Sequence, residues 1–251
     1  MSAANTVRLR EIVIPQREII KLSKIRKRHY LMLTNILRDL NLLQKILLFI
    51  KNSDKKEGPI RAAFSMTLFF FLKLLISKDY EAIRFIEDKS IAAAKSTYSQ
   101  DLQDKLTAIE DFLSDGKAKK LFRFIRNKFG FHYDTQTKIE PMLHQIMNDC
   151  EKIEMWLSED SANEIFSSSY AIMTEAIFRY MIKLKYASDY DALMDKLFEL
   201  PLECAKLIRS FCVYYLEEVI LRDIALEQHS IVEVEAPLLS EVKLPFIVRA
   251  E

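Results

Sequence analysis

Apolar residues recur at helical spacing through most of the chain. In the first such segment, about 16–51, they stand at Ile19, Leu22, Ile25, Leu33, Ile36, Leu37, Leu40, Leu43 and Leu47. Intervals of three and four residues indicate a helix that buries one face. A second segment, about 60–77, includes the stretch FSMTLFFFLKLLI and is apolar nearly all round, which predicts a central core helix. This apolar run includes Lys73 and is shorter than the roughly 20 residues of a membrane span.

Turn-forming residues divide the rest of the chain into further predicted helices. We place these helices at about 79–95, 98–114, 117–129, 138–157, 163–186, 189–199 and 202–228. Asp79 is predicted to cap the first of them, and Gly116 to separate two others. Pro201 is placed in a first helical turn, where proline is tolerated. The clearest linker is NSDKKEGP at 52–59. The pattern predicts an all-α helical bundle.

The C-terminal segment breaks the helical pattern. Residues 231–235 alternate between apolar and polar, and Pro237 and Pro245 exclude a helix through the tail. We expect a short strand or an extended arm that lies on the body or on a partner. The predicted organisation is a helical core over 1–160, additional helices over 161–230 in the same domain or beside it, and an extended tail over 231–251.

Composition narrows the classes of function. Only three glycines occur, each alone, which disfavours an all-β fold and excludes a Walker or Rossmann phosphate loop. With 37 basic and 36 acidic residues, nucleic-acid binding must use a local patch. Three cysteines without a Cys-x-x-Cys pair, and an N-terminus without the apolar core of a signal peptide, lead us to expect a cytoplasmic protein that uses no membrane, metal or cofactor. We interpret the basic run before His29 as a solvated helix face, with nucleic-acid or acidic-membrane binding as the alternative.

One short stretch, 126–132, indicates chemistry. On the helix predicted at 117–129, Arg126 lies at the edge of the apolar arc and Asn127 lies on the polar side. His132 is six residues after Arg126, so an unbroken helix would point the two side chains about 120° apart. Gly130 provides a place for the helix to end and for the chain to turn His132 back towards Arg126 and Asn127.

These three residues together would suit metal-independent cleavage of a phosphodiester. His132 would transfer a proton, Arg126 would stabilise charge on the phosphate, and Asn127 would orient either group. A run of cations without an intervening acid precedes the site and is expected to bind the RNA backbone: Lys117, Lys119, Lys120, Arg123 and Lys128. Plainer interpretations stay open. His132 could sit on the surface or at a helix end, Arg126 could pair with a neighbouring acid, and Asp134 could cap the next helix.

The stretch Ile125-Arg126-Asn127-Lys128-Phe129-Gly130-Phe131-His132-Tyr133-Asp134 resembles the HEPN superfamily, in which an arginine is followed at a distance of four to six residues by a histidine. The resemblance is to members associated with abortive infection and toxin–antitoxin loci. It implies a four- to five-helix core, a homodimer with two motifs facing one cleft, endoribonuclease activity, and an antitoxin or defence-system protein as partner. We assign supporting roles to Glu81, Tyr133 and Asp134. Because the fold also occurs without activity, a noncatalytic interaction or nucleotide-binding module is the alternative.

Overall fold

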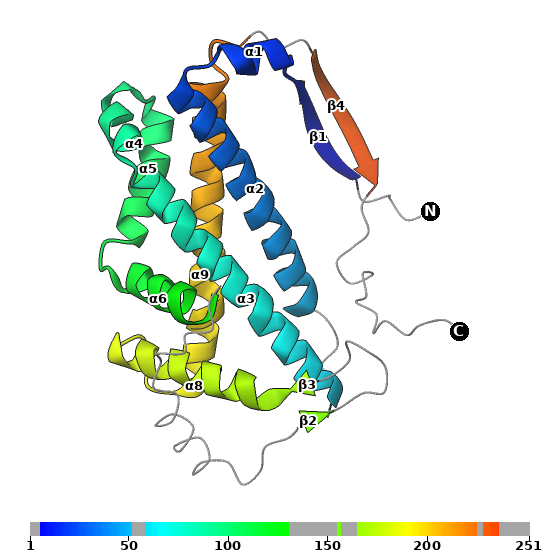
Figure 1. Cartoon of the computed structure of the whole chain (residues 1–251), viewed down its shortest axis with the longest axis vertical. Helices are drawn as coiled ribbons and strands as arrows, with labels where there is room; N and C mark the ends of the chain where they lie inside the picture. The colour runs from blue at the N-terminus through cyan, green and yellow to red at the C-terminus, as the bar shows by residue number, and fades with distance from the viewer. Residues whose placement is uncertain (1–5, 52–58, 131–154, 157–164, 225–227, 236–251) are drawn as a thin grey trace.

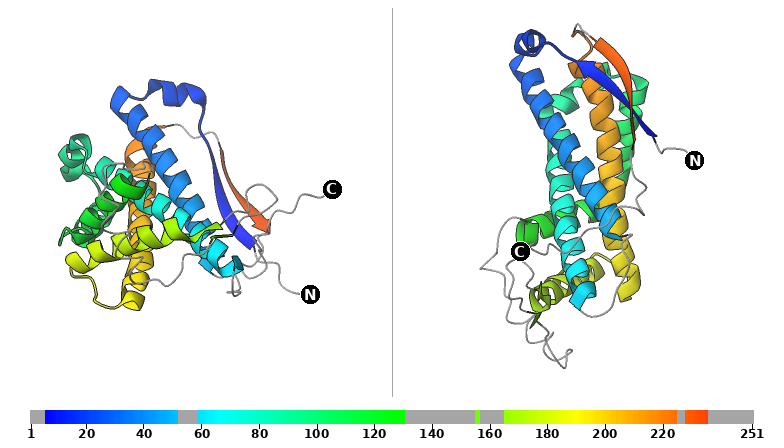
Figure 2. Two further views of the ribbon diagram at one scale, coloured as in Figure 1. Left: turned by 60° about the horizontal axis from the view of Figure 1, so that its bottom comes forward. Right: turned by 90° about the vertical axis from the view of Figure 1, so that its right-hand side faces the viewer.

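The computed structural model describes residues 6–51, 59–130, 155–156, 165–224 and 228–235. This part of the chain is an all-α helical bundle, as predicted. Three long helices pack against one another along its length (Figures 1 and 2): α2 (Lys24–Lys51), α3 (Pro59–Ile86) and α9 (Tyr190–Tyr215). Shorter helices pack around them: α4 (Lys89–Ala94), the 3₁₀ turn η1 (Lys95–Thr97), α5 (Gln100–Phe112), α6 (Lys117–Ile125) and α8 (Ser167–Lys183).

The core lies where α3 meets its neighbours. Phe69, Leu72 and Leu75 are fully buried, which confirms that the most apolar segment forms a core helix, although Phe70 in the same run is half exposed. Helix α3 contacts α2, α6, α8 and α9, and a single buried cluster extends through all of them. Within the described residues, no helix has the length and hydropathy needed to cross a bilayer.

The helix predicted at 16–51 is in fact two helices. Helix α1 (Gln16–Lys21) ends at Leu22, whose extended backbone (ψ 145°) turns the chain. The Ser23 hydroxyl then accepts a hydrogen bond from the Arg26 amide at 3.3 Å, which caps the start of α2. The apolar spacing continues across this corner because Leu22 is itself buried.

Asp79 does not cap a helix, so that prediction is wrong. Helix α3 continues unbroken through Asp79 to Ile86, and Asp79 lies fully buried on it. The apolar face persists on both sides, with Ile76 and Ile83 buried, so packing keeps the segment helical. The true cap is Asp88, whose carboxylate accepts from the Ser90 amide at the start of α4.

Pro201 does not begin a helix either. It lies inside α9, which replaces the two helices predicted at 189–199 and 202–228. A proline within a helix forfeits one backbone hydrogen bond. Here Pro201 is buried together with Leu197, Cys204 and Ile208, and this packing offsets the loss. Beyond α9, a single π-helical turn, η3 (Leu216–Ile220), ends the helical segment before residue 228.

The two ends of the described chain form a ribbon. Strand β1 (Thr6–Val13) pairs antiparallel with β4 (Gln228–Glu235), with Thr6 opposite Glu235 and Val13 opposite Gln228 (Figure 1). This confirms the strand expected over 231–235. A smaller pair, β2 (Met155–Trp156) with β3 (Ile165–Phe166), corrects the helices predicted at 138–157 and 163–186: the first does not include 155–156, and the second begins at Ser167. Residues 138–154 lie outside the described part of the chain.

Candidate functional site

Arg126 and Asn127 follow directly on α6. Gly116 has a φ of +67°, a left-handed conformation that glycine adopts without strain, and it lets the chain turn from α5 into α6. Helix α6 then buries Leu121, Phe122 and Ile125 in the core. After Ile125 the segment widens into the π-helical turn η2 (Arg126–Gly130). Such turns break the helical register and occur often at functional sites.

The Arg126 guanidinium lies between two oxygen groups. Its Nη2 is 2.8 Å from Glu81 Oε1 on α3, and its Nη1 donates a hydrogen bond to Asn127 Oδ1 at 3.1 Å. The contact with Glu81 is an ion pair without hydrogen-bond geometry, and Arg126 Nε is enclosed without a hydrogen-bond partner among the described residues. The Arg126 side chain is 29% exposed. It is therefore held in one place while part of it still faces solvent. Glu81, expected to be a supporting acid, is the residue that holds it.

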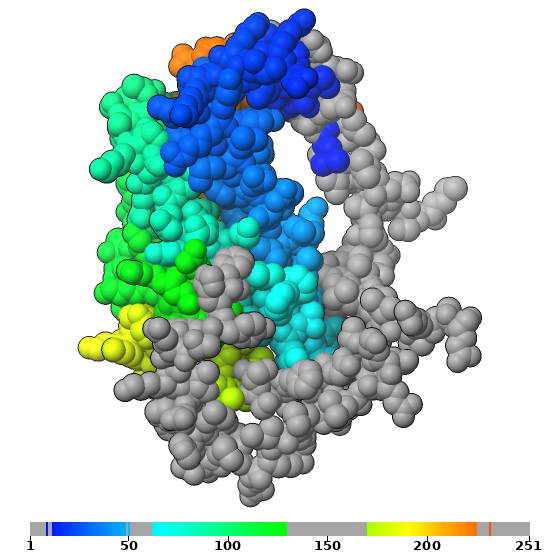
Figure 3. All heavy atoms as spheres, in the orientation of Figure 1, coloured from blue at the N-terminus to red at the C-terminus, as the bar shows by residue number. Residues whose placement is uncertain are grey.

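The basic residues before the site differ in their ion pairing and in their exposure to solvent. Lys119 donates to both oxygens of Glu87, the residue directly after α3, at 2.5 and 2.7 Å. Lys120 and Arg123 are exposed, whereas Lys128 is partly buried. Figure 3 shows the green surface of α6 against the turquoise surface of α3. Because Glu81 on α3 pairs with Arg126 and Glu87, directly after α3, pairs with Lys119, the surface around these basic residues is less positive than their own sequence indicates.

The remaining predicted site residues, His132, Tyr133 and Asp134, lie outside the described residues. The described segment ends at Gly130, so the predicted return of His132 towards Arg126 stays a prediction. The structure does bring Arg126, Asn127 and Glu81 together, from two helices that are far apart in sequence.

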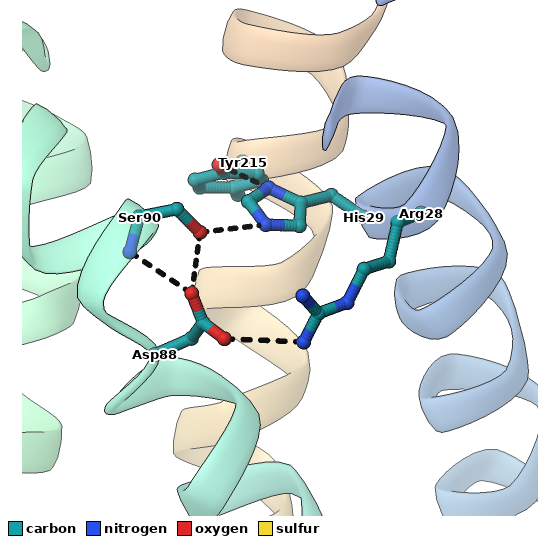
Figure 4. A network of polar contacts seen from close by, with 5 residues as sticks. All are labelled: Arg28, His29, Asp88, Ser90 and Tyr215. Carbon is teal, nitrogen blue, oxygen red and sulfur yellow. Dashed lines mark hydrogen bonds and ion pairs between the residues drawn. The ribbon is translucent and has the colours of Figure 1, made fainter. Parts of the chain in front are cut away.

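A second polar cluster, which the sequence analysis missed, is centred on His29 (Figure 4). His29 is 2% exposed; its Nδ1 lies 2.9 Å from the Tyr215 hydroxyl and its Nε2 lies 3.0 Å from Ser90 Oγ. Ser90 Oγ donates to Asp88 Oδ1 at 2.5 Å, and Arg28 Nη2 lies 3.1 Å from Asp88 Oδ2. The network therefore joins α2, α4 and α9. The interpretation of a solvated face concerned only the basic run before His29, in which Arg28 is exposed; His29 itself is buried, and no feature of the run indicates this.

The hydrogen-bond directions decide what this cluster can do. Since Ser90 gives its proton to Asp88, its oxygen accepts from His29 Nε2–H, and His29 Nδ1 accepts from Tyr215. Burial lowers the pKa of His29, against the opposing effect of Asp88. The hydrogen bonds from Ser90 lower the pKa of Asp88. In this arrangement His29 does not activate Ser90 as a nucleophile, because the hydroxyl proton points to Asp88. The cluster therefore stabilises the packing of α2, α4 and α9 through its hydrogen bonds.

Asp79 is the most unusual ionisable group in the described chain. It is fully buried, and neither carboxyl oxygen has a hydrogen-bond partner among the described residues; Ser77 Oγ, two residues before it, also has none there. Burial raises the pKa of Asp79 well above its ordinary value. Burial, and secondarily the nearness of Asp79, raises the pKa of the Cys204 thiol. Cys204 and Cys212 are buried free thiols.

Comparisons with known proteins do not assign the site to a family. No family model, curated protein or solved structure matches the chain. Among the residues that the structure describes, no three His, Cys, Asp or Glu side chains are grouped to hold a metal ion. The chemistry at Arg126 must therefore be argued from its own residues.

Proposed function

We propose that this protein is a metal-independent endoribonuclease of the HEPN type, with Arg126, Asn127 and His132 at its active site. The observation that carries the proposal is the guanidinium of Arg126, held between Glu81 and Asn127 with part of its surface facing solvent. A fixed arginine can meet a phosphate without first losing side-chain freedom, which favours stabilisation of the transition state over mere attraction of the substrate.

The reaction would proceed by attack of a ribose 2′-hydroxyl on the adjacent phosphate. His132 takes the proton of the 2′-hydroxyl, or supplies one to the departing 5′-oxygen, and the P–O5′ bond breaks as the P–O2′ bond forms. Arg126 stabilises the charge that accumulates on the phosphate oxygens, and Asn127 orients the phosphate. Exposed Lys120 and Arg123 attract the RNA backbone towards the site. A homodimer would place two such sets in one cleft, and an antitoxin or another defence protein would control access to it.

An RNA-cleavage assay in EDTA tests the proposal. Wild type should cleave a single-stranded substrate, whereas His132→Ala and Arg126→Ala should lose 100-fold or more of kcat, about the contribution of one proton-transfer group or one transition-state donor. Glu81→Gln keeps the shape of the side chain but frees Arg126, so it should lower kcat more than it raises KM. Arg222→Ala, an exposed arginine after η3, is the control and should cleave like wild type. Equal cleavage by wild type, H132A and R126A would overturn the catalytic assignment.

A noncatalytic helical module for protein interaction or nucleotide binding is the second candidate. The observation in its favour is that Arg126 already has an acidic partner, Glu81, as expected of an ion pair that ties α6 to α3. It predicts no RNA cleavage and an unchanged partner affinity in His132→Ala. A nucleotide-binding module would also show a higher melting temperature with added nucleotide, since a ligand of the folded state stabilises it.

A further inference from the structure

Two ion pairs fix how α3 and α6 lie against each other. Lys119 on α6 pairs with Glu87, the residue directly after α3, and Arg126, the first residue after α6, pairs with Glu81 on α3. Since the number rises along one helix as it falls along the other, the helices run antiparallel at this contact. Each ion pair forms one rung between them.

A third rung lies between these two. In sequence, Arg84 on α3 stands midway between Glu81 and Glu87, and Arg123 on α6 stands between Lys119 and Arg126. The flanking pairs therefore place Arg84 and Arg123 at the same level, with one cation on each helix. Both residues are exposed.

The central rung has no carboxylate of its own. Arg84 Nη1 lies 3.9 Å from Glu81 Oε2, at the limit of an ion pair, and the other oxygen of Glu81 faces Arg126. Among the described residues, the ion pairs formed by α6 and the residue that follows it are those of Lys117, Lys119 and Arg126, and none includes Arg123. The outer rungs are each neutral, so the two arginines of the central rung leave two uncompensated positive charges, and the exposed Lys120 adds a third. Like charges on adjacent helical positions repel, so an anion between them would relieve a cost that the free protein bears.

We propose that Arg84 and Arg123 form an anion clamp that binds one phosphate of single-stranded RNA. Two guanidinium groups from facing helices present planar forks of N–H donors, which match phosphate oxygens better than lysine does. Arg123 precedes Arg126 by three residues, a rise of about 4.5 Å along the helix, so the clamped phosphate lies next to the phosphate at Arg126. The choice of RNA as ligand rests on the proposed function, whereas the binding itself requires no cleavage.

The test measures binding separately from cleavage. The probe is a fluorescent 2′-O-methyl oligouridylate of 12 nucleotides, which has no free 2′-hydroxyl and cannot be cut. Its Kd is measured by anisotropy over a range of salt concentrations for wild type, Arg84→Gln, Arg123→Gln and the double variant, with Arg222→Gln as the control. Circular dichroism confirms that each variant is folded.

If both arginines hold the same phosphate, removal of either should weaken binding roughly tenfold, about the contribution of one charged hydrogen-bonding group. The double variant should then be little weaker than either single variant. The slope of log Kd against log salt should fall by about 0.7, the value for one single-strand phosphate contact, in all three variants. Wild-type affinity in the single variants, or additive losses with a twofold larger drop in slope, would overturn the clamp.

The same measurements keep the clamp distinct from the enzyme and from a site for free phosphate. If the protein binds the probe through both arginines but cleaves no RNA, the clamp is supported and the proposed catalysis is refuted. Cleavage with unchanged binding in R84Q and R123Q would refute the clamp alone. Inorganic phosphate, added at matched ionic strength, should compete only weakly, and competition at micromolar phosphate would overturn RNA as the ligand.

Discussion

Substitution of Asp79 by asparagine should stabilise the protein, increasingly so as the pH rises. Asp79 is fully buried, and its oxygens have no hydrogen-bond partner in the part of the chain that the structure describes. The folded state therefore favours the neutral acid, and burial raises the pKa of Asp79 well above its ordinary value. The unfolded chain instead ionises Asp79 near pH 4. Above that pH the unfolded state releases a proton that the folded state retains, so the stability contributed at low pH is lost as pH rises towards the folded pKa.

The size of this effect follows from linkage. Between the unfolded and folded pKa values of Asp79, wild type should lose about 1.4 kcal/mol per pH unit relative to Asp79→Asn, whose side chain does not titrate. Below pH 4 the two proteins should differ little, since both then bury a neutral polar group of the same shape. The pH at which the difference stops growing reports the folded pKa.

Urea unfolding at a series of pH values, followed by the helical signal in circular dichroism, measures this difference. Asp195→Asn, an exposed acid on α9, is the matched control and should show no growing difference from wild type. A difference between wild type and D79N that stays constant with pH, or that shrinks as pH rises, would refute the argument that Asp79 is buried as a neutral acid.

Two further predictions concern His29 and Gly116. Burial lowers the pKa of His29, so the stability that its neutral form contributes above the unfolded pKa of about 6.5 should be lost as pH falls towards the folded pKa. In the same unfolding assay between pH 7.5 and 5.5, the free energy of unfolding of His29→Gln should lack this dependence on pH. A pH dependence equal to that of wild type would contradict the prediction. Gly116→Ala should lower the free energy of unfolding by about 1–2 kcal/mol through backbone strain alone, since a Cβ there meets no atom of the described residues within 4 Å. Gly116→Asn should lower the free energy of unfolding by less. Equal losses in both variants would contradict strain as the cause.

Much of the fold could be predicted because apolar spacing reports burial directly. The helical intervals locate α2, α5 and the part of α3 up to residue 77, and the alternation at 231–235 locates part of β4; the predicted break between 77 and 79 does not occur in α3. The errors fall where residue type and position conflict. Asp79 and Pro201 are both typical of helix ends, yet both lie inside long helices, because neighbours such as Ile83 and Leu197 bury the face on which they stand.

The candidate site was predictable only in part, for a different reason. A run of cations without an acid is visible in sequence, but the acids that pair with it lie on α3 or directly after it, some 30 to 45 residues earlier. No local pattern shows that Glu87 meets Lys119 or that Glu81 meets Arg126. The role proposed for Arg84 could not be predicted for the same reason, because only the antiparallel packing of α3 and α6 places it opposite Arg123. Pairings across helices are set by tertiary packing, which a pattern along one helix does not report.

Helix α3 carries both the buried acid and the surface charges, and its geometry keeps their effects separate. Asp79 and Glu81 are two residues apart, so their side chains point about 200° apart around the helix. Asp79 lies near Cys204 of α9, while Glu81 pairs with Arg126 after α6. The desolvation of Asp79 therefore acts on the free energy of unfolding, and the Arg84–Arg123 clamp acts on anion affinity, without a shared partner between them. Because sites that share no partner contribute independently, the double variant should show the stability change of D79N and the affinity change of R84Q, each unaltered by the other substitution. Coupling between them would mean that α3 shifts as a whole, and that the buried acid helps to set how closely α3 approaches α6.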